Sequence, residues 1–188
     1  ASHDRVMILE VMGRDAGFIA LEAGIAGGAD VILIPEIEFK IDNIVAKIKE
    51  LQATGMNYAR IIVSEAARME DGKLAMVDQG KDQIRYGGIG DYIKRSIEDD
   101  LEADVRVQVL GHTQRGGSPT WNDRLLAKML GVKAVDLIDQ GKFGYMAAFK
   151  DGKITEVSVE QAVSGSRTVD PNGSLVHTAK SLGIYLGD

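Results

Sequence analysis

The hydrophobic residues of this chain follow two alternating patterns. Short apolar runs are typical of buried strands, and they lie at residues 6–11, 31–34, 59–63 and 105–109. Between these runs, apolar residues recur every three to four positions, which predicts helices from Asp15 to about residue 26, from Asp42 to Gly55 and over residues 89–101. Strand and helix therefore alternate up to about residue 115.

The glycine-rich stretch that follows ends in a helix signal. Ser118 has the chemistry of an N-cap and Pro119 suits the first helical position, so a helix is expected over residues 119–140. A last helix is expected after residues 171–173.

Residues 145–149 and 153–159 flank Asp151-Gly152, a dipeptide typical of a type I′ hairpin turn. Apart from this hairpin, the elements alternate between strand and helix. The pattern predicts an α/β fold, a Rossmann-like parallel sheet with helices on both faces.

Composition and charge limit the class of protein. With 188 residues, 45% of them hydrophobic, the chain is long enough for one domain or a domain and a half. Its net charge of −6 would repel a long polyanion, so we expect no nucleic-acid partner. The absence of cysteine excludes a disulfide framework, and the absence of a long apolar run predicts no membrane span. Because the first residue is not methionine, we expect the sequence to be a fragment.

The glycine-rich turn at residues 109–119 carries His112 and Arg115. Glycines let backbone N–H groups approach an anion, the following helix N-terminus favours negative charge, and the two side chains add directed donors. We therefore expect a phosphate site. Taken alone, the turn is equally typical of a tight strand-to-helix connection with solvated polar side chains.

Other polar residues follow the remaining predicted strands. The first strand is followed by Met12-Gly13-Arg14, the second by Glu36 and the third by Glu65. Ligands of open α/β sheets bind at the carboxyl ends of the strands, so these residues and the glycine-rich turn should share one rim. Arginine and histidine suit a phosphate and carboxylates suit hydroxyl groups, so the rim predicts a phosphorylated sugar as ligand.

Four segments, taken in order, resemble the C-terminal half of the 6-phosphofructokinase family. They are residues 10–14, 34–36, 64–65 and 109–119, which read EVMGR, IPE, SE and VLGHTQRGGSP. The resemblance covers essentially the whole chain. It implies the phosphofructokinase fold and the transfer of a phosphoryl group from ATP or pyrophosphate to O1 of fructose 6-phosphate. It also implies a cytoplasmic, glycolytic homodimer or homotetramer.

The resemblance assigns roles to residues around the first strand. Met12 and Gly13 match positions that contact the fructose. Arg14 matches the catalytic position beside the transferred phosphoryl group, and Glu65 matches a residue that binds sugar hydroxyls.

The resemblance also assigns four phosphate ligands. His112 and Arg115 match two residues that bind the 6-phosphate, and Arg5 and Arg106 match two more that reach into the site of the neighbouring subunit. Arginine supplies planar pairs of donors, which suits a dianionic phosphate. Without the resemblance, Arg106 would be interpreted as a solvated strand residue and Arg5 as part of a frayed terminus.

Two motifs of the family are missing from this sequence. The catalytic aspartate lies in Thr-Ile-Asp-Asn-Asp and the nucleotide and Mg²⁺ loop in Gly-Gly-Asp, both in the family's N-terminal half. Residues 41–43 and 87–90 imitate these motifs in part, but we interpret them as a helix cap and a helix-entry loop. The resemblance therefore implies that donor and Mg²⁺ bind outside this chain, which holds no metal or cofactor site and is inactive alone.

The resemblance also divides the chain. Residues 1–113 and 165–188 would form the fructose 6-phosphate-binding domain, and residues 114–164 would pack on the absent N-terminal donor-binding domain. The alternative is a non-catalytic sugar-phosphate sensor that uses the same rim.

Allosteric bacterial members bind an effector nucleotide at a basic cluster that precedes the strand ending at the position of Glu65. This chain has residues 54–57, Thr-Gly-Met-Asn, in that place, although it keeps an acidic residue at Asp30. We therefore expect classical effector control to be lost, because an anion would be held poorly there. Such loss is common in the mixed-substrate and pyrophosphate-dependent branches, which residues 86–90 also resemble.

Overall fold

The computed structural model describes residues 4–69, 72, 76–80 and 83–187. The chain divides into two compact units, one formed by Ala1–Gln114 with Arg167–Asp188 and the other by Arg115–Ser166. The first unit contains a four-stranded sheet, and the second contains a helix packed on a hairpin.

The sheet of the first unit is parallel, as predicted. Its spatial order is β2 (Val31–Leu33), β3 (Tyr58–Ser64), β1 (Arg5–Val11) and β6 (Asp104–Val109). Val6 of β1 lies opposite Ala59 of β3 and Val105 of β6, so apolar side chains form a row across three strands. Tyr185 forms an isolated bridge to Val31 at the β2 edge.

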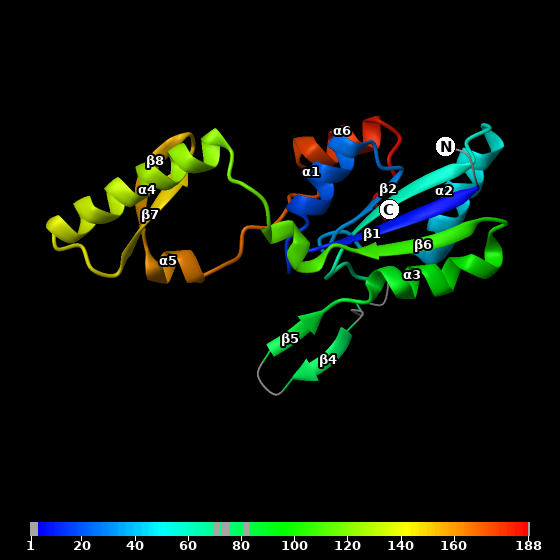
Figure 1. The fold of residues 1–188 in the computed structure, drawn as a ribbon, viewed down its shortest axis with the longest axis horizontal. Helices are drawn as coiled ribbons and strands as arrows, with labels where there is room; N and C mark the ends of the chain where they lie inside the picture. Colours follow the sequence, from blue (N-terminus) through cyan, green and yellow to red (C-terminus); the bar gives the residue numbers. More distant parts are fainter. Residues whose placement is uncertain (1–3, 70–71, 73–75, 81–82, 188) are drawn as a thin grey trace. The chain divides into compact units, whose positions relative to one another are not determined.

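Helices cover both faces of this sheet, which confirms the predicted fold class (Figure 1). One face carries α2 (Ile41–Ala53) and α3 (Ile89–Ile97), and the other carries α1 (Phe18–Gly27) and α6 (Ser174–Ser181). Ile8 and Ile93 belong to the first of the two buried cores, and Leu21 and Ile32 to the second. Successive residues of a strand point to opposite faces, so each central strand supplies both cores.

Two helices begin at residues other than the predicted caps. The N-cap of α1 is Gly17 and that of α2 is Lys40, and neither makes a side-chain capping hydrogen bond. The prediction that Asp15 and Asp42 act as caps is therefore wrong. Asp42 lies in the first turn of α2, where its negative charge still interacts favourably with the helix dipole.

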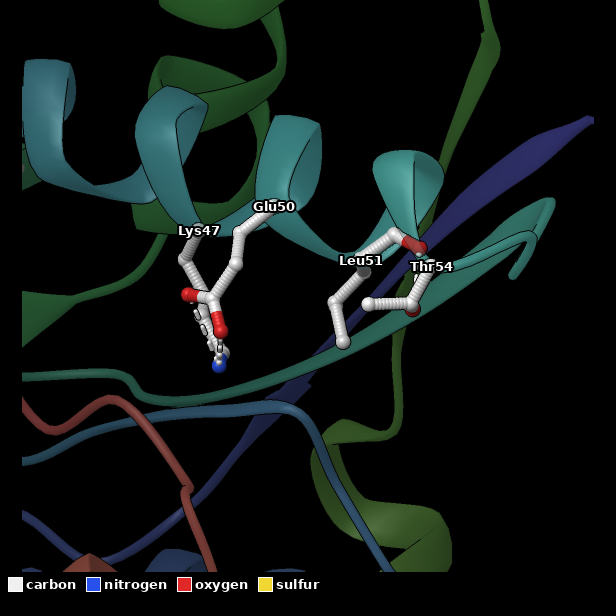
Figure 2. A network of polar contacts seen from close by, with 4 residues as sticks. All are labelled: Lys47, Glu50, Leu51 and Thr54. Atoms are coloured by element: carbon white, nitrogen blue, oxygen red, sulfur yellow. Dashed lines mark hydrogen bonds and ion pairs between the residues drawn. The ribbon is translucent and has the colours of Figure 1, made fainter.

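The C-terminal ends of these helices follow the sequence more closely. Gly28 closes α1 with a φ of +67°, the left-handed conformation that glycine adopts without strain. In the last turns of α2, the Lys47 ammonium donates to Glu50 at 3.2 Å and the Thr54 hydroxyl donates to the Leu51 carbonyl at 2.7 Å (Figure 2).

An antiparallel hairpin interrupts the predicted alternation of strand and helix. β4 (Met76–Gly80) pairs with β5 (Gln83–Tyr86), in a polar stretch whose sequence predicts no strand. The hairpin leads into α3 through Gly88, the helix N-cap, whose φ is +81°. A short 3-10 helix, η1 (Glu98–Asp100), follows α3 where the sequence predicts a continuous helix.

The second unit contains α4 (Trp121–Asp139), β7 (Tyr145–Lys150), β8 (Lys153–Ser158) and α5 (Val159–Val163). The predicted hairpin turn is confirmed, since Asp151 and Gly152 have φ values of +51° and +76°. Glu156 of β8 accepts hydrogen bonds from Lys133 and Lys142, which lower the pKa of its carboxyl group.

The predicted start of α4 is wrong by two residues. The cap is Thr120 rather than Ser118: the Thr120 hydroxyl accepts from the Asp123 N–H at 3.3 Å and the Asp123 carboxylate accepts from the Thr120 N–H at 2.8 Å. This reciprocal pair is a capping box. Pro119 therefore precedes the cap instead of opening the helix.

Candidate functional site

The loop after β1, residues 12–17, forms the centre of the candidate site. Gly13 turns the chain so tightly that a Cβ atom there would lie 2.6 Å from the Ala16 carbonyl oxygen. The turn is closed by a hydrogen bond of 3.2 Å, which the Ala16 N–H donates to the Gly13 carbonyl oxygen. Arg14 follows with a φ of +48°, a left-handed conformation that is costly for a residue with a side chain.

Glu65 holds this loop from the end of β3. Its Oε1 accepts hydrogen bonds from the backbone N–H groups of Gly13 at 3.1 Å and Arg14 at 3.0 Å. The structure therefore brings these three predicted site residues together at the carboxyl ends of β1 and β3. A carboxylate has more acceptor capacity than these two bonds use, so it is able to accept from a ligand hydroxyl as well.

Gln114 and Glu36 hold the two ends of the same loop. The Gln114 side-chain carbonyl accepts from the Met12 N–H at 2.8 Å. Glu36 accepts from the Gly17 N–H at 3.0 Å and from the Val169 N–H at 2.7 Å. The sequence places Glu36 among the ligand-binding carboxylates of the rim. In the structure its carboxylate instead joins α1 to the segment that returns from residue 167 onward.

His112 and Arg115 lie on a short 3-10 helix, η2 (Gly111–Arg115), that directly follows β6. Gly111 begins it with a φ of +49°. Both side chains are exposed, and Arg115 is the first residue of the second unit. Their assignment to a phosphate stays a prediction.

Arg5 and Arg106 lie at the opposite end of the sheet. Both contact Asp104: the Arg5 Nε lies 3.5 Å and the Arg106 Nε 2.8 Å from the same carboxylate oxygen. β1 runs from Arg5 to Val11, about 20 Å at the usual rise of a strand. The structure therefore brings these two arginines together, but at a distance from the loop that carries Arg14.

Residues 87–90 bind a carboxylate of the protein itself. Glu10, buried in β1, accepts from the N–H groups of Gly88 at 3.3 Å and Gly90 at 2.9 Å. Because these donors at the start of α3 are already used, the segment does not offer them to a phosphate. Gly88 is the N-cap of α3, so the interpretation of this stretch as a helix-entry loop is confirmed.

Sequence reasoning missed Tyr86. Its hydroxyl donates to the Asp15 carboxylate at 2.6 Å, across 71 positions of sequence. This hydrogen bond and partial burial raise the pKa of Tyr86, while the charges of Arg68 and Arg14 act in the opposite direction. A single tyrosine at the end of a polar stretch carries no sequence signal for such a contact.

Sequence reasoning also gave no role to Ser64, at the end of β3. Its hydroxyl is fully buried without a hydrogen-bond partner, and a Cβ on Gly13 would lie 3.3 Å from it. The hydroxyl therefore lies directly behind the turn at Gly13.

Among the residues that the structure describes, no three His, Asp or Glu side chains are arranged to hold a metal ion. Within the same part of the chain, no helix is both long and apolar enough to cross a membrane.

Comparison with known proteins matches this chain to a protein family. The model of the family described as phosphofructokinase matches residues 1–138. ATP-dependent 6-phosphofructokinase 1 of Nostoc sp. is 54% identical over 188 residues, which cover 100% of this chain and 52% of that protein. The protein of the same name from Synechocystis sp. is 52% identical with the same coverage. The chain thus spans about half the length of these curated relatives.

Solved structures agree with the fold. Phosphofructokinase of Pichia pastoris in the T-state has a TM-score of 0.72 and 32% identity, over 97% of this chain and 19% of its own. A pyrophosphate-dependent phosphofructokinase from Nitrosospira multiformis has a TM-score of 0.75 over 100% of this chain and 50% of its own. At 23% identity, the second likeness supports the fold alone.

Proposed function

Because the chain belongs to the phosphofructokinase family, we propose that it supplies the sugar-phosphate half of a 6-phosphofructokinase active site. The enzyme would transfer a phosphoryl group to O1 of fructose 6-phosphate and release fructose 1,6-bisphosphate, a glycolytic reaction. The observation that carries this proposal is the pair of hydrogen bonds from Gly13 and Arg14 to Glu65, at the strand ends where α/β sheets bind ligands.

In this proposal the loop after β1 contacts the reacting end of the sugar. Met12 and Gly13 lie against the fructose, and Glu65 accepts hydrogen bonds from its hydroxyl groups. Arg14 stabilises the negative charge of the transferring phosphoryl group, and it is prepared for this because its backbone is already fixed by Glu65.

The 6-phosphate would be held by His112 and Arg115. A dianion of this kind is bound through several charge-assisted hydrogen bonds, and both side chains are exposed on the turn after β6. The preceding Gly111 supports the assignment, because its positive φ lets the chain turn sharply at the end of the strand.

We propose ATP as the donor, since the relatives from Nostoc sp. and Synechocystis sp. carry ATP-dependent in their names. Mg²⁺ would accompany the nucleotide. The family's Thr-Ile-Asp-Asn-Asp and Gly-Gly-Asp motifs are missing from this sequence, so the resemblance implies that the N-terminal half of the enzyme would hold the donor, the metal ion and the base for the sugar hydroxyl. The proposed location of the enzyme is the cytoplasm.

Arg5 and Arg106 would complete the site of a second copy in a homodimer or homotetramer. Arg5 lies about 20 Å before the end of β1, and Arg106, which is opposite Met7, lies about 13 Å before it, so neither arginine side chain reaches the loop of Arg14 within one sheet. Asp104 holds both guanidinium groups, and this shared contact keeps them together at one end of the sheet.

The second unit would pack on the donor-binding half of the complete enzyme. Within residues 115–166, all of which the structure describes, Leu137 is the only buried hydrophobic side chain, while Trp121, Phe143 and Val163 are each more than 75% exposed. Apolar exposure of this extent is typical of a surface that is covered by another part of the protein. Residues 1–113 and 165–188 would bind the sugar phosphate, and residues 114–164 would contact the donor-binding half.

We further propose that the effector site of allosteric members is not functional here. A cavity of about 370 Å³ lies beside the relevant segment, and its lining contains no basic residue: Asp4, Gln52, Gly55, Met56, Asn57 and Glu102. The Asp30 carboxylate is already engaged by the backbone N–H of Arg60 at 2.8 Å and by its Nε at 3.4 Å. An anionic nucleotide would therefore meet Asp4 and Glu102 in this cavity, and no basic residue among its lining residues.

The test is a coupled assay of fructose 1,6-bisphosphate formation by the full-length gene product, with ATP and with pyrophosphate, together with calorimetry of fructose 6-phosphate binding. We expect turnover with ATP. Binding without turnover by either donor would favour the non-catalytic sensor, and the absence of both would reject the assignment to this sugar phosphate.

A further inference from the structure

We propose that Tyr86 is a positioning residue for Arg14, acting through its hydrogen bond to Asp15. The inference rests on the proposed function of Arg14 beside the transferred phosphoryl group. Neither Tyr86 nor Asp15 would touch the substrate. Their role would be to hold the backbone of residues 12–17 in the conformation that presents the Arg14 guanidinium.

The loop after β1 is held from several sides. Gln114 accepts from Met12, and Glu65 accepts from the next two residues, so the first half of the loop is fixed through its backbone. On the far side of Arg14, the loop is held at Gly17 by Glu36 and at Asp15 by Tyr86. The Tyr86 hydroxyl is thus the nearest side-chain contact that follows Arg14 along the loop.

Tyr86 is well placed to act as a fixed anchor. It is half-buried, and the segment that follows it is bound to β1 because Glu10 accepts from Gly88 and Gly90. Residues 86–90 are therefore attached to the chain both before and after the turn at residues 12–14. A short phenol-to-carboxylate hydrogen bond of 2.6 Å is stronger than one between neutral groups.

The unfavourable backbone conformation of Arg14 explains why the loop needs such an anchor. Its φ of +48° is unfavourable for a residue with a side chain, and such conformations persist only where surrounding contacts impose them. When the hydroxyl of Tyr86 is removed, Asp15 is released and Arg14 is free to relax toward an ordinary backbone conformation. Misplacement of a group that acts on the transition state lowers turnover more than substrate affinity.

The experiment compares Tyr86→Phe, Asp15→Ala and the double variant in the full-length gene product. We expect kcat to fall roughly tenfold to 100-fold in each, with KM for fructose 6-phosphate within about twofold of the wild type. The double variant should be no worse than the worse single variant, since both remove the same contact. Asp15→Asn keeps a neutral acceptor and should recover part of the loss.

Hydrogen exchange of the amides of residues 12–17 provides a readout that does not depend on catalysis. We expect faster exchange in Tyr86→Phe and unchanged exchange in the control Tyr92→Phe, which removes the hydroxyl of a half-buried tyrosine on α3. Unchanged exchange in Tyr86→Phe overturns the proposal even if the wild type has no activity. Faster exchange with unchanged kcat in an active enzyme also overturns it, because the contact would then be structural only.

Discussion

At the scale of single residues, three glutamates show how the loops around the sheet are built. Glu10, Glu36 and Glu65 each accept hydrogen bonds from two backbone N–H groups that no strand or helix satisfies. An N–H group that is shielded from water and left unpaired is costly, so a carboxylate that accepts from it stabilises the loop before it binds any ligand. Of the three, only Glu65 holds residues that match the family's substrate contacts.

Replacement of Gly13 tests how tightly this turn is built. In Gly13→Ala the new Cβ would lie 2.6 Å from a backbone oxygen, so the loop must shift, and we expect a loss of roughly 1–3 kcal/mol in the free energy of unfolding. Fructose 6-phosphate binding should weaken as well. Gly27→Ala, at the last residue of α1, is the control, because a Cβ atom there would have no neighbour within 4 Å. Urea unfolding with equal losses in both variants would contradict this picture of the turn.

Replacement of Arg115 tests the phosphate assignment. In Arg115→Ala the 6-phosphate would lose a charged donor, which should weaken fructose 6-phosphate binding by roughly 1.5–3 kcal/mol. Isothermal calorimetry on the full-length gene product measures the change. Arg124→Ala, at an exposed arginine of α4, is the control and should bind as the wild type does. Equal affinities in the two variants would reject the role of Arg115.

At the scale of secondary structure, the sequence predicts best where side chains are buried. The four strands of the sheet and the helices packed on it carry strong apolar periodicity, and they lie where it places them. Helix starts are predicted less well, because Asp15 and Ser118 have capping chemistry but the backbone begins its helical turns at Gly17 and Thr120. The hairpin of β4 and β5 was missed because the sequence of these strands lacks a regular alternation of apolar and polar residues.

Some features of the candidate site could also be predicted from the sequence, and others could not. Its position at the carboxyl ends of the strands follows from the order of elements alone, and the contact of Gly13 with Glu65 agrees with that expectation. The contact of Tyr86 with Asp15 could not be predicted, because it joins a loop to an unpredicted hairpin. The contacts of Glu36 within the fold could not be predicted either, because one of its two hydrogen-bond partners, Val169, lies 133 positions away in the sequence.

The capping box of α4 provides a test at this scale. Thr120→Ala removes the acceptor of the Asp123 N–H, and the loss of such a cap costs roughly 0.5–2 kcal/mol. Ser118→Ala is the matched control, because the structure gives Ser118 no capping bond. Urea unfolding of the chain, followed by far-ultraviolet circular dichroism, measures both. A larger loss in Ser118→Ala would restore the cap that the sequence first suggested.

At the scale of the whole molecule, the two ends of the sheet carry different groups. The carboxyl ends hold the loop of Arg14 and Glu65, and the opposite end holds Arg5 and Arg106 around Asp104. A single copy is therefore able to present both sets of groups but not to combine them through its sheet. The role that the family resemblance implies for Arg5 and Arg106 as phosphate ligands therefore requires that a second copy supply them.

We expect the 188-residue chain by itself to transfer no phosphoryl group from ATP or pyrophosphate. Arg14 is able to stabilise charge on a transferring group only when a donor, a metal ion and a base are held in line with it. The family's motifs for the catalytic aspartate and for the nucleotide and Mg²⁺ are missing from this sequence. The curated relatives are about twice as long, which leaves room for those groups elsewhere.

The measurement is a coupled assay of the purified chain with each donor, beside the full-length gene product as the positive control. Calorimetry with fructose 6-phosphate on the same samples separates loss of binding from loss of chemistry. Turnover by the chain alone would show that a base and a donor site lie within these residues, and that Arg14 and Glu65 are only part of the catalytic group that the chain contains.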